Sequence, residues 1–158
     1  MTQADADDAM SYPPAPAGPM SHRAGHGETI VVVDDTIEIR ELLAEVLSLE
    51  GFRVVPCPDP LDALDTVVAE RPALVIVDLT MAGVDGLAVV DQLAADPRTR
   101  ATPFLVCSGA ISEIHAAEAA IKSLGGDVLA KPFELDLLIR KAGTLIGRAA
   151  TASGASEE

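Results

Sequence analysis

The stretch from Ala73 to Val77 is an unbroken apolar run that stops at a carboxylate, Asp78, and is followed by a loop that ends at Gly86. A continuous apolar run of this kind is typical of a strand buried on both faces, as in a parallel sheet covered by helices. In an open α/β sheet, ligands bind in the crevice beyond the carboxyl ends of the strands. We therefore expect Asp78 to stand at the C-terminal edge of its strand, facing that crevice.

Similar apolar runs recur along the chain and alternate with segments of helical periodicity. The predicted strands cover residues 29–33, 52–57, 73–78, 102–107 and 127–130. The predicted helices follow at residues 39–49, 59–70, 86–95, 112–124 and 134–148, with Thr36 as N-cap of the first and Gly51 after its end. These successive βα units predict an α/β fold: a five-stranded parallel sheet in the order 2-1-3-4-5 with helices on both faces.

The length of 158 residues suggests one domain with tails. Residues 1–27 are rich in Ala, Pro, Gly, Ser and Asp and lack periodicity, which predicts a disordered tail. The folded domain is expected over residues 28–148. Residues 149–158 are small and polar, and we expect them to form a second disordered tail.

The composition excludes several classes of function. A net charge of −14 argues against a general affinity for nucleic acid or anionic membranes, because both need clustered Lys and Arg. No apolar stretch approaches the roughly 20 residues needed to span a bilayer. Asp5, Asp7 and Asp8 stand where a secretory signal would carry positive charge, so we expect a cytoplasmic protein. Cys57 and Cys107 fall inside apolar runs, which favours buried thiols over a disulfide.

Polar side chains follow four of the predicted strands at the same edge of the sheet: Asp34 and Asp35, Asp78, Ser108, and Lys131. Three carboxylates packed together repel one another, and a divalent cation would relieve that repulsion. Oxygen-only ligands and an open site suit Mg²⁺, which keeps several of its waters. Lys131 adds a charge able to pair with a carboxylate or a phosphoryl oxygen, and Ser108 adds a hydroxyl that can donate to the same oxygen.

This set of groups meets the requirements of phosphoryl transfer, which are a nucleophile, a metal and cationic neutralisation. No Cys or activated Ser stands at the centre, so the nucleophile would be a carboxylate that forms an aspartyl-phosphate. Taken singly, each group has an ordinary structural explanation as a turn residue, a helix cap or a solvated loop residue. Their joint placement at the ends of four strands favours the phosphoryl-transfer site.

The same residues resemble a known family, the receiver domain of two-component response regulators, over residues 28–148. The resemblance depends on four motifs, each at the end of a predicted strand. They are Val-Val-Val-Asp-Asp at 31–35, Val-Asp-Leu-Thr-Met at 77–81 with Asp-Gly at 85–86, Ser108, and Lys-Pro-Phe at 131–133.

The resemblance implies that Asp78 is the phospho-acceptor, attacking the phosphohistidine of a sensor histidine kinase or a histidine phosphotransfer protein. Ser108 would follow the phosphoryl group after transfer, and Lys131 would contact it. The resemblance also implies slow self-hydrolysis, in which the side chains of Thr80 and Ala110 influence the access of water.

The metal ligands come from the resemblance as well. Asp35 and Asp78 would bind Mg²⁺ directly, together with the main-chain carbonyl of Thr80. Asp34 would hold the metal mainly through water.

Three positions depart from the family pattern. Ala82 stands where the family usually has Pro, which predicts a looser loop after the acceptor, and Gly109 replaces the usual Ala. Val128, three residues before Lys131, stands where the family commonly carries Tyr or Phe. In typical receivers that aromatic side chain swings inward and reports phosphorylation. We therefore expect the chemistry to be retained and the relay of the signal to differ.

The first predicted function is a stand-alone phosphorylation switch rather than a turnover enzyme. Only ten residues follow Arg148, and no helix-turn-helix or basic patch is present, so we expect no direct binding of DNA. Output would come from binding a downstream protein or from passing the phosphoryl group onward in a relay.

Two other functions are weighed against the switch. A phosphorylation-independent protein-binding module is favoured by Val128 and opposed by the complete acceptor site. A Mg²⁺-dependent phosphohydrolase is disfavoured by Thr80, because such enzymes often place a second Asp two residues after the nucleophile.

Overall fold

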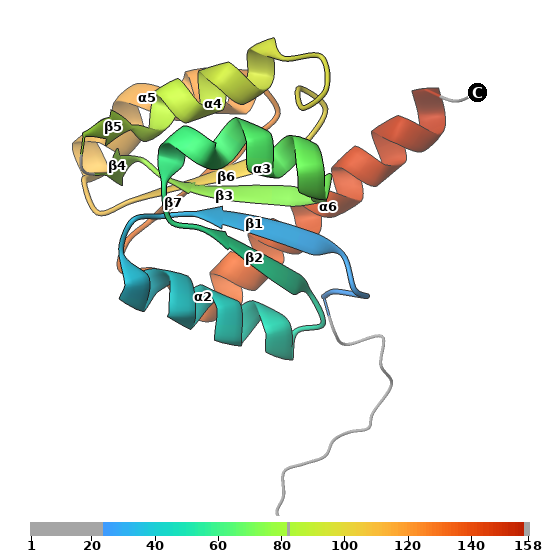
Figure 1. Cartoon of the computed structure of the whole chain (residues 1–158), viewed down its shortest axis with the longest axis horizontal. Helices are drawn as coiled ribbons and strands as arrows, with labels where there is room; N and C mark the ends of the chain where they lie inside the picture. The colour runs from blue at the N-terminus through green and yellow to red at the C-terminus, as the bar shows by residue number, and fades with distance from the viewer. Residues whose placement is uncertain (1–23, 82, 157–158) are drawn as a thin grey trace, which may run out of the picture.

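The structure, a computed structural model, describes residues 24–81 and 83–156 and has a five-stranded parallel sheet at its centre (Figure 1). The strands of this sheet are β1 (Thr29–Val33), β2 (Arg53–Cys57), β3 (Leu74–Asp78), β6 (Phe104–Ser108) and β7 (Asp127–Ala130). Their order is β2-β1-β3-β6-β7, which is the predicted order 2-1-3-4-5 when these strands are counted along the chain. The predicted α/β fold is therefore confirmed.

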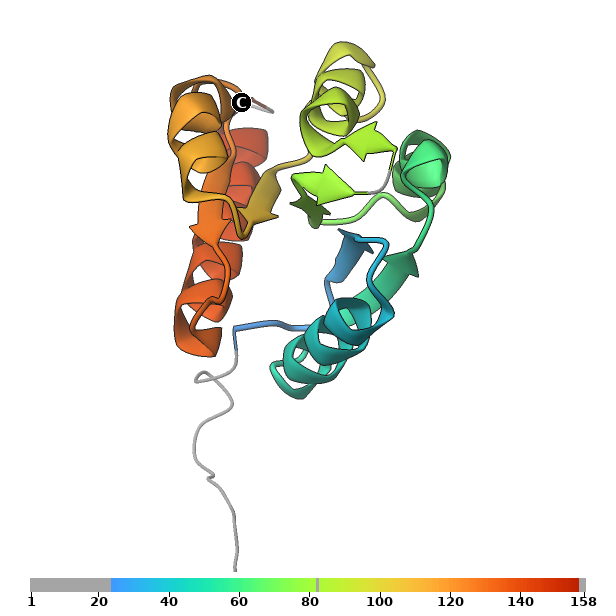
Figure 2. The ribbon, with the colours of Figure 1, turned by 90° about the vertical axis from the view of Figure 1, so that its left-hand side faces the viewer.

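Helices cover both faces of the sheet. They are α2 (Ile37–Leu49), α3 (Ala63–Glu70), α4 (Gly86–Ala95), α5 (Ile111–Ser123) and α6 (Leu135–Ser156), and the short 3-10 turn η4 (Pro60–Asp62) precedes α3. The side chains of α2 and α6 pack on one face and those of α3, α4 and α5 on the other. Figure 2, turned by 90°, keeps α2 and α4 on opposite sides of the strands. Within the described residues, no helix is both long enough and apolar enough to cross a membrane.

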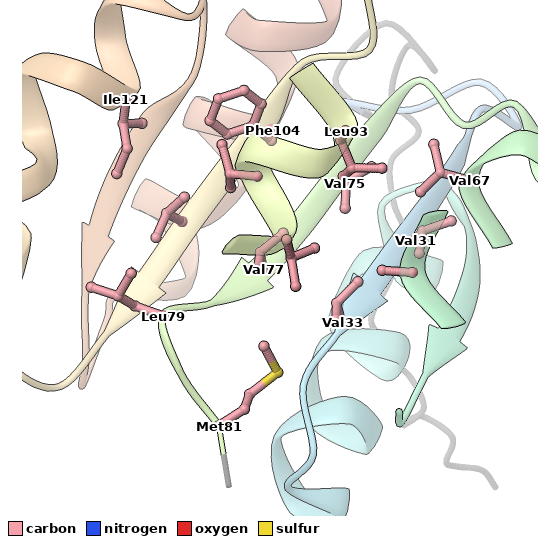
Figure 3. Close-up of a cluster of buried hydrophobic side chains, with 14 of the residues drawn as sticks. Val31, Val33, Val67, Val75, Val77, Leu79, Met81, Leu93, Phe104 and Ile121 are labelled. Atoms are coloured by element: carbon pink, nitrogen blue, oxygen red, sulfur yellow. The ribbon is translucent and has the colours of Figure 1, made fainter. Parts of the chain in front are cut away.

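Each central strand divides its side chains between two cores, because successive side chains point to opposite faces. Val75 and Val77 of β3 pack beneath α3, α4 and α5, in the cluster drawn in Figure 3. Leu74 and Ile76 pack against α2 and α6 instead. Every residue of β3 is buried, which explains why its sequence is a continuous apolar run and not an alternating one.

A small antiparallel hairpin follows β3, and the sequence periodicity did not predict it. β4 (Thr80–Met81) pairs with β5 (Val84–Asp85), so that Thr80 lies opposite Asp85. Two-residue strands are too short to produce a repeat that could be detected in the sequence. Ala82, for which a looser loop was predicted, lies outside the described residues.

Residues 24–27, predicted as part of the N-terminal tail, belong to the fold. The amide of Gly25 donates to the carbonyl of Glu50 (2.8 Å), and that of Gly27 donates to the carbonyl of Gly51 (2.7 Å). Gly51 has a φ of +96°, the left-handed conformation expected after a helix, and a Cβ there would collide with the Gly25 carbonyl. The predicted boundary is wrong because the segment is held mainly by hydrogen bonds of its backbone amides, which leave no pattern in the side chains. The rest of that predicted tail, residues 1–23, lies outside the described residues.

The last helix, α6, continues past the predicted end at Arg148 to Ser156. The prediction of a disordered tail is therefore wrong for residues 149–156, and residues 157–158 lie outside the described residues. The segment contains four alanines, at 149, 150, 152 and 155, and no proline, so local propensity favours continuing the helix.

Candidate functional site

Three carboxylates meet at the C-terminal edge of the sheet. Asp34 and Asp35 follow β1 directly, and Asp78 ends the neighbouring strand β3, whose Val77 pairs with Val33. One oxygen from each of the three lies within 4.8 Å of the others. Asp34 and Asp78 are buried, with 2% and 6% of their surface exposed, whereas Asp35 is exposed. The cluster is therefore closed on the protein side and open to solvent at Asp35.

Lys131 supplies the positive charge at this cluster. It follows β7, and its amide donates to the carbonyl of Ser108 (2.7 Å), which extends the pairing of β6 with β7. Its ammonium lies 3.4 Å from Asp34 Oδ2 and 3.4 Å from Asp78 Oδ1. The Lys131–Pro132 peptide bond is cis. One ammonium thus faces two buried carboxylates, so the site keeps an excess of negative charge.

Burial and charge shift the titration of these groups. Burial raises the pKa of the Asp78 carboxyl above its ordinary value, and Lys131 opposes this effect without cancelling it. Burial acts to lower the pKa of Lys131, but the charges of Asp34 and Asp78 outweigh it, so that pKa is raised. Lys131 is therefore firmly protonated at neutral pH, while ionised Asp78 is held at a cost in free energy that an added cation would reduce.

Ser108 ends β6, the strand beside β3, and is fully buried. Across the two strands, its predecessor Cys107 pairs with Asp78. The Ser108 hydroxyl accepts a hydrogen bond from the amide of Ala110 (3.0 Å). That bond uses a lone pair, so the hydroxyl proton remains for another acceptor.

Thr80 connects β3 to the hairpin. Its amide donates to Asp78 Oδ1 at 3.4 Å, near the long end of the hydrogen-bond range. Its hydroxyl donates to Oε1 of Glu113 on α5 (3.1 Å). The residue two positions after Asp78 therefore contacts both the Asp78 carboxylate and a neighbouring helix.

The Asp85–Gly86 pair fixes the start of α4 against the end of β3. Asp85 caps the helix by accepting from the amide of Leu87 (2.9 Å), and the Gly86 amide donates to the Leu79 carbonyl (2.8 Å). A Cβ on Gly86 would collide with the backbone carbonyl oxygen of Asp78. Only glycine permits this close approach, so the pair holds the loop after Asp78 in place.

Two further side chains reach the site, and the sequence did not reveal them. Arg40 on α2 donates through Nη1 to the Asp34 carbonyl (2.8 Å), and Glu113 accepts from Thr80. Arg40 lies four residues beyond Thr36, which stands at the N-cap position of α2 without a side-chain capping bond; the Thr36 amide donates instead to Asp34 Oδ1 (2.9 Å). Arg40 lies in the first turn of the helix that Thr36 was predicted to cap, so that prediction could have pointed to Arg40. No spacing in the sequence pointed to Glu113.

Val128 is buried on the α3, α4 and α5 side of the sheet, where it belongs to the same core cluster as Val77 and Val106. Its carbonyl accepts a hydrogen bond from Lys141 on α6 (2.8 Å). A small aliphatic side chain therefore fills the position of the family's aromatic residue as ordinary core packing.

The site fits Mg²⁺. Its three converging carboxylates offer the oxygen ligands that this ion prefers, and exposed Asp35 leaves room for the waters that it retains. The combined negative charge of the three carboxylates also exceeds the single positive charge of Lys131.

Comparisons with known proteins agree with the geometry. The family model of the response regulator receiver domain matches residues 30–142. Sporulation initiation phosphotransferase F of Bacillus subtilis is 34% identical over 110 residues, which are 69% of this chain and 86% of that protein. Response regulator MprA of Mycolicibacterium vanbaalenii is 34% identical over 128 residues, 81% of this chain but 54% of that protein. The chain thus spans about half the length of that relative.

Solved structures give the same result. NtrX from Brucella abortus has a TM-score of 0.73 at 31% identity, covering 82% of this chain and 29% of that one. A sensor protein from Polaromonas sp. JS666 has a TM-score of 0.71 at 27% identity, covering 77% of this chain and 98% of that one. With the fold, the acidic site and the family match in agreement, this chain belongs to the response regulator receiver domain family, whose members are phospho-acceptors in two-component signalling.

Proposed function

We propose that this chain accepts a phosphoryl group on Asp78 from a phosphohistidine of a sensor histidine kinase or a histidine phosphotransfer protein. The observation that carries the proposal is the position of Lys131, whose ammonium lies 3.4 Å from both Asp34 and Asp78 inside a cluster of three carboxylates. A buried acid beside a cation and a second acid is an arrangement suited to receiving a tetrahedral anion and neutralising it.

In the proposed step, an oxygen of the Asp78 carboxylate attacks phosphorus. The bond from phosphorus to the imidazole nitrogen breaks, and the electron pair leaves with the imidazole of the donor. Lys131, now paired with Asp34 and Asp78, is close enough to pair with the new phosphoryl oxygens, and the Ser108 hydroxyl has a proton to donate to them.

Asp34, Asp35, Asp78 and the carbonyl of Thr80 are the groups that we propose hold Mg²⁺. When bound, the ion would offset the negative charge that the acceptor and the phosphoryl group share. Among the carboxylates, exposed Asp35 is the ligand whose replacement disturbs the fold least.

We further propose that the domain works as a stand-alone receiver and signals by binding a downstream protein or by passing the phosphoryl group onward. The relative from Bacillus subtilis supports the second route, because the chain covers 86% of a protein named as a phosphotransferase. The acidic composition supports a protein target over DNA.

Burial of Val128 in the core favours one competing function, a binding module that works without phosphorylation. One experiment separates the two. The chain is incubated with Mg²⁺ and acetyl phosphate, and the phosphoryl group is followed by intact mass and by its lability in alkali. Slow stoichiometric labelling that is lost in Asp78→Asn and kept in Asp91→Asn, an exposed position on α4, supports the acceptor. Absence of labelling supports the binding module, and continued turnover of acetyl phosphate indicates a hydrolase.

A further inference from the structure

A pocket of about 490 Å³ opens beside the acceptor loop, between the β4–β5 hairpin and α5. This volume lies in the range of ordinary ligand pockets. Its apolar floor is formed by Leu79, Met81, Val84, Leu87, Ala116 and Ala117. The described lining also includes the carboxylates of Asp85 and Glu113 and contains no Lys, Arg or His. The pocket thus combines an apolar floor with negative charge at exposed positions.

The hydrogen bond from Thr80 to Glu113 crosses the lining of this pocket. It joins the hairpin to the first turn of α5, with 3.1 Å between the two oxygens, and both side chains are exposed. Thr80 also contacts the acceptor, because its amide donates to Asp78 Oδ1. Thr80 therefore contacts both the Asp78 carboxylate and the Glu113 carboxylate in the lining of the pocket.

Phosphorylation would set two acceptors in competition for one proton. A threonine hydroxyl can donate a single hydrogen bond, and here it is given to Glu113. A phosphoryl group on Asp78 adds charged oxygens that are stronger acceptors, and its negative charge repels the Glu113 carboxylate. Both effects act against the Thr80–Glu113 bond and release Glu113.

Given the phosphorylation of Asp78 proposed above, we propose that this pocket is a docking site for a lysine or arginine side chain of a partner protein. The Thr80–Glu113 bond holds the Glu113 carboxylate against the hairpin in the unphosphorylated chain, and loss of that bond frees the carboxylate to pair with the occupant. Charge complementarity selects this occupant. The methylene stem of Lys or Arg suits the apolar floor, and its charged head suits Asp85 and the released Glu113. This route to α5 does not depend on an aromatic residue at Val128.

The chain carries its own reporter for the test. Met81 lines the pocket and is the one methionine within the described residues, so a methyl-labelled methionine there reports occupancy by NMR. The probe is butylguanidinium, which mimics an arginine side chain, and butylurea is its neutral counterpart of similar shape. Both are titrated into the full chain before and after phosphorylation with acetyl phosphate and Mg²⁺.

We expect butylguanidinium to bind the phosphorylated chain about threefold more tightly than butylurea does, the effect of an exposed ion pair. We also expect butylguanidinium to bind the phosphorylated chain about threefold more tightly than it binds the unphosphorylated chain. Thr80→Ala frees Glu113 without phosphorylation, so it should bind butylguanidinium as the phosphorylated chain does. Glu113→Gln should lose the preference, whereas Glu118→Gln should keep it, because Glu118 lies on the same helix outside the pocket and pairs with Lys122.

Equal affinity for the two probes, or equal affinity for butylguanidinium with and without phosphorylation, would overturn the proposal. Mass measured on the same samples separates this failure from that of the proposed function. A phosphoryl group present on Asp78 without any change at Met81 overturns the docking site alone. Absence of the phosphoryl group from Asp78 overturns the proposed function, and with it the dependence of docking on phosphorylation.

Discussion

The ammonium of Lys131 lies 3.4 Å from Oδ1 of Asp78, although 53 positions in the chain separate the two residues. Because β3, β6 and β7 are parallel neighbours in the sheet, the C-terminal ends of β3 and β7 lie at the same edge. The contact between Lys131 and Asp78 therefore depends on the arrangement of the strands, and a substitution of Lys131 tests its role.

Replacing Lys131 by Met keeps the length of the side chain and removes its charge. We expect labelling of Asp78 by acetyl phosphate to slow by about 100-fold, because a preorganised charge beside the reacting oxygens is lost. The initial rate of labelling, measured by intact mass, checks this. Lys122→Met is the matched control, since Lys122 is an exposed lysine on α5 that pairs with Glu118. Labelling of Lys131→Met within twofold of wild type would contradict the role proposed for this lysine.

Added Mg²⁺ should stabilise the folded chain through Asp35. At a concentration ten times the dissociation constant, binding to the folded state alone adds about 1.4 kcal/mol to the free energy of unfolding. Asp35→Asn should unfold at nearly the same denaturant concentration with Mg²⁺ as with EDTA, whereas Asp91→Asn should respond as wild type does. Equal stabilisation of Asp35→Asn by Mg²⁺ would remove Asp35 from the metal site.

The pH dependence of stability should change in Asp78→Asn. Because the pKa of Asp78 is raised in the folded chain, the folded state binds more protons than the unfolded state, and stability falls as pH rises from the ordinary value of 3.8 toward neutrality. The asparagine variant lacks this component. Its free energy of unfolding should exceed that of wild type at pH 7, and the excess should shrink toward pH 4. Urea unfolding in EDTA at several pH values measures the difference. An excess that grows on acidification would have the wrong sign.

Gly86→Ala should destabilise the domain by about 2 kcal/mol, because the new methyl group collides with backbone and not with a side chain that could turn away. Gly147→Ala on α6 is the contrasting variant. A Cβ there meets nothing within 4 Å, so alanine should stabilise the helix by about 0.5–1 kcal/mol. Urea unfolding of both variants tests the pair. Equal changes in the free energy of unfolding would contradict the prediction that a methyl group on Gly86 collides with the Asp78 carbonyl.

The sequence predicted those parts of the molecule that repeat or that carry distinct chemistry. Strand β7 and helix α4 begin and end at the predicted residues, because apolar runs and helical periodicity report burial directly. Asp34, Asp35, Asp78 and Lys131 meet as predicted, because parallel strands deliver their carboxyl ends to one edge.

The features that were not predicted depend on single contacts between distant segments. The bond between Thr80 and Glu113 joins an exposed hydroxyl to an exposed carboxylate, and neither residue type is unusual where it stands. The packing of Gly25 against Glu50 involves backbone atoms only. The continuation of α6 to Ser156 agrees with the alanine content of this segment. The segment was predicted to be a tail because its residues are small and polar.

The division of β3 between two cores has a consequence for how such a domain can diversify. Ile76 and Val77 are adjacent in the chain, yet they belong to opposite hydrophobic layers that share only the sheet between them. Substitutions that remodel the layer under α3, α4 and α5, and with it the outer surface of those helices, leave the layer under α2 and α6 intact. A lineage can therefore change one outer surface of the domain while the opposite half of the molecule continues to hold β3 in register.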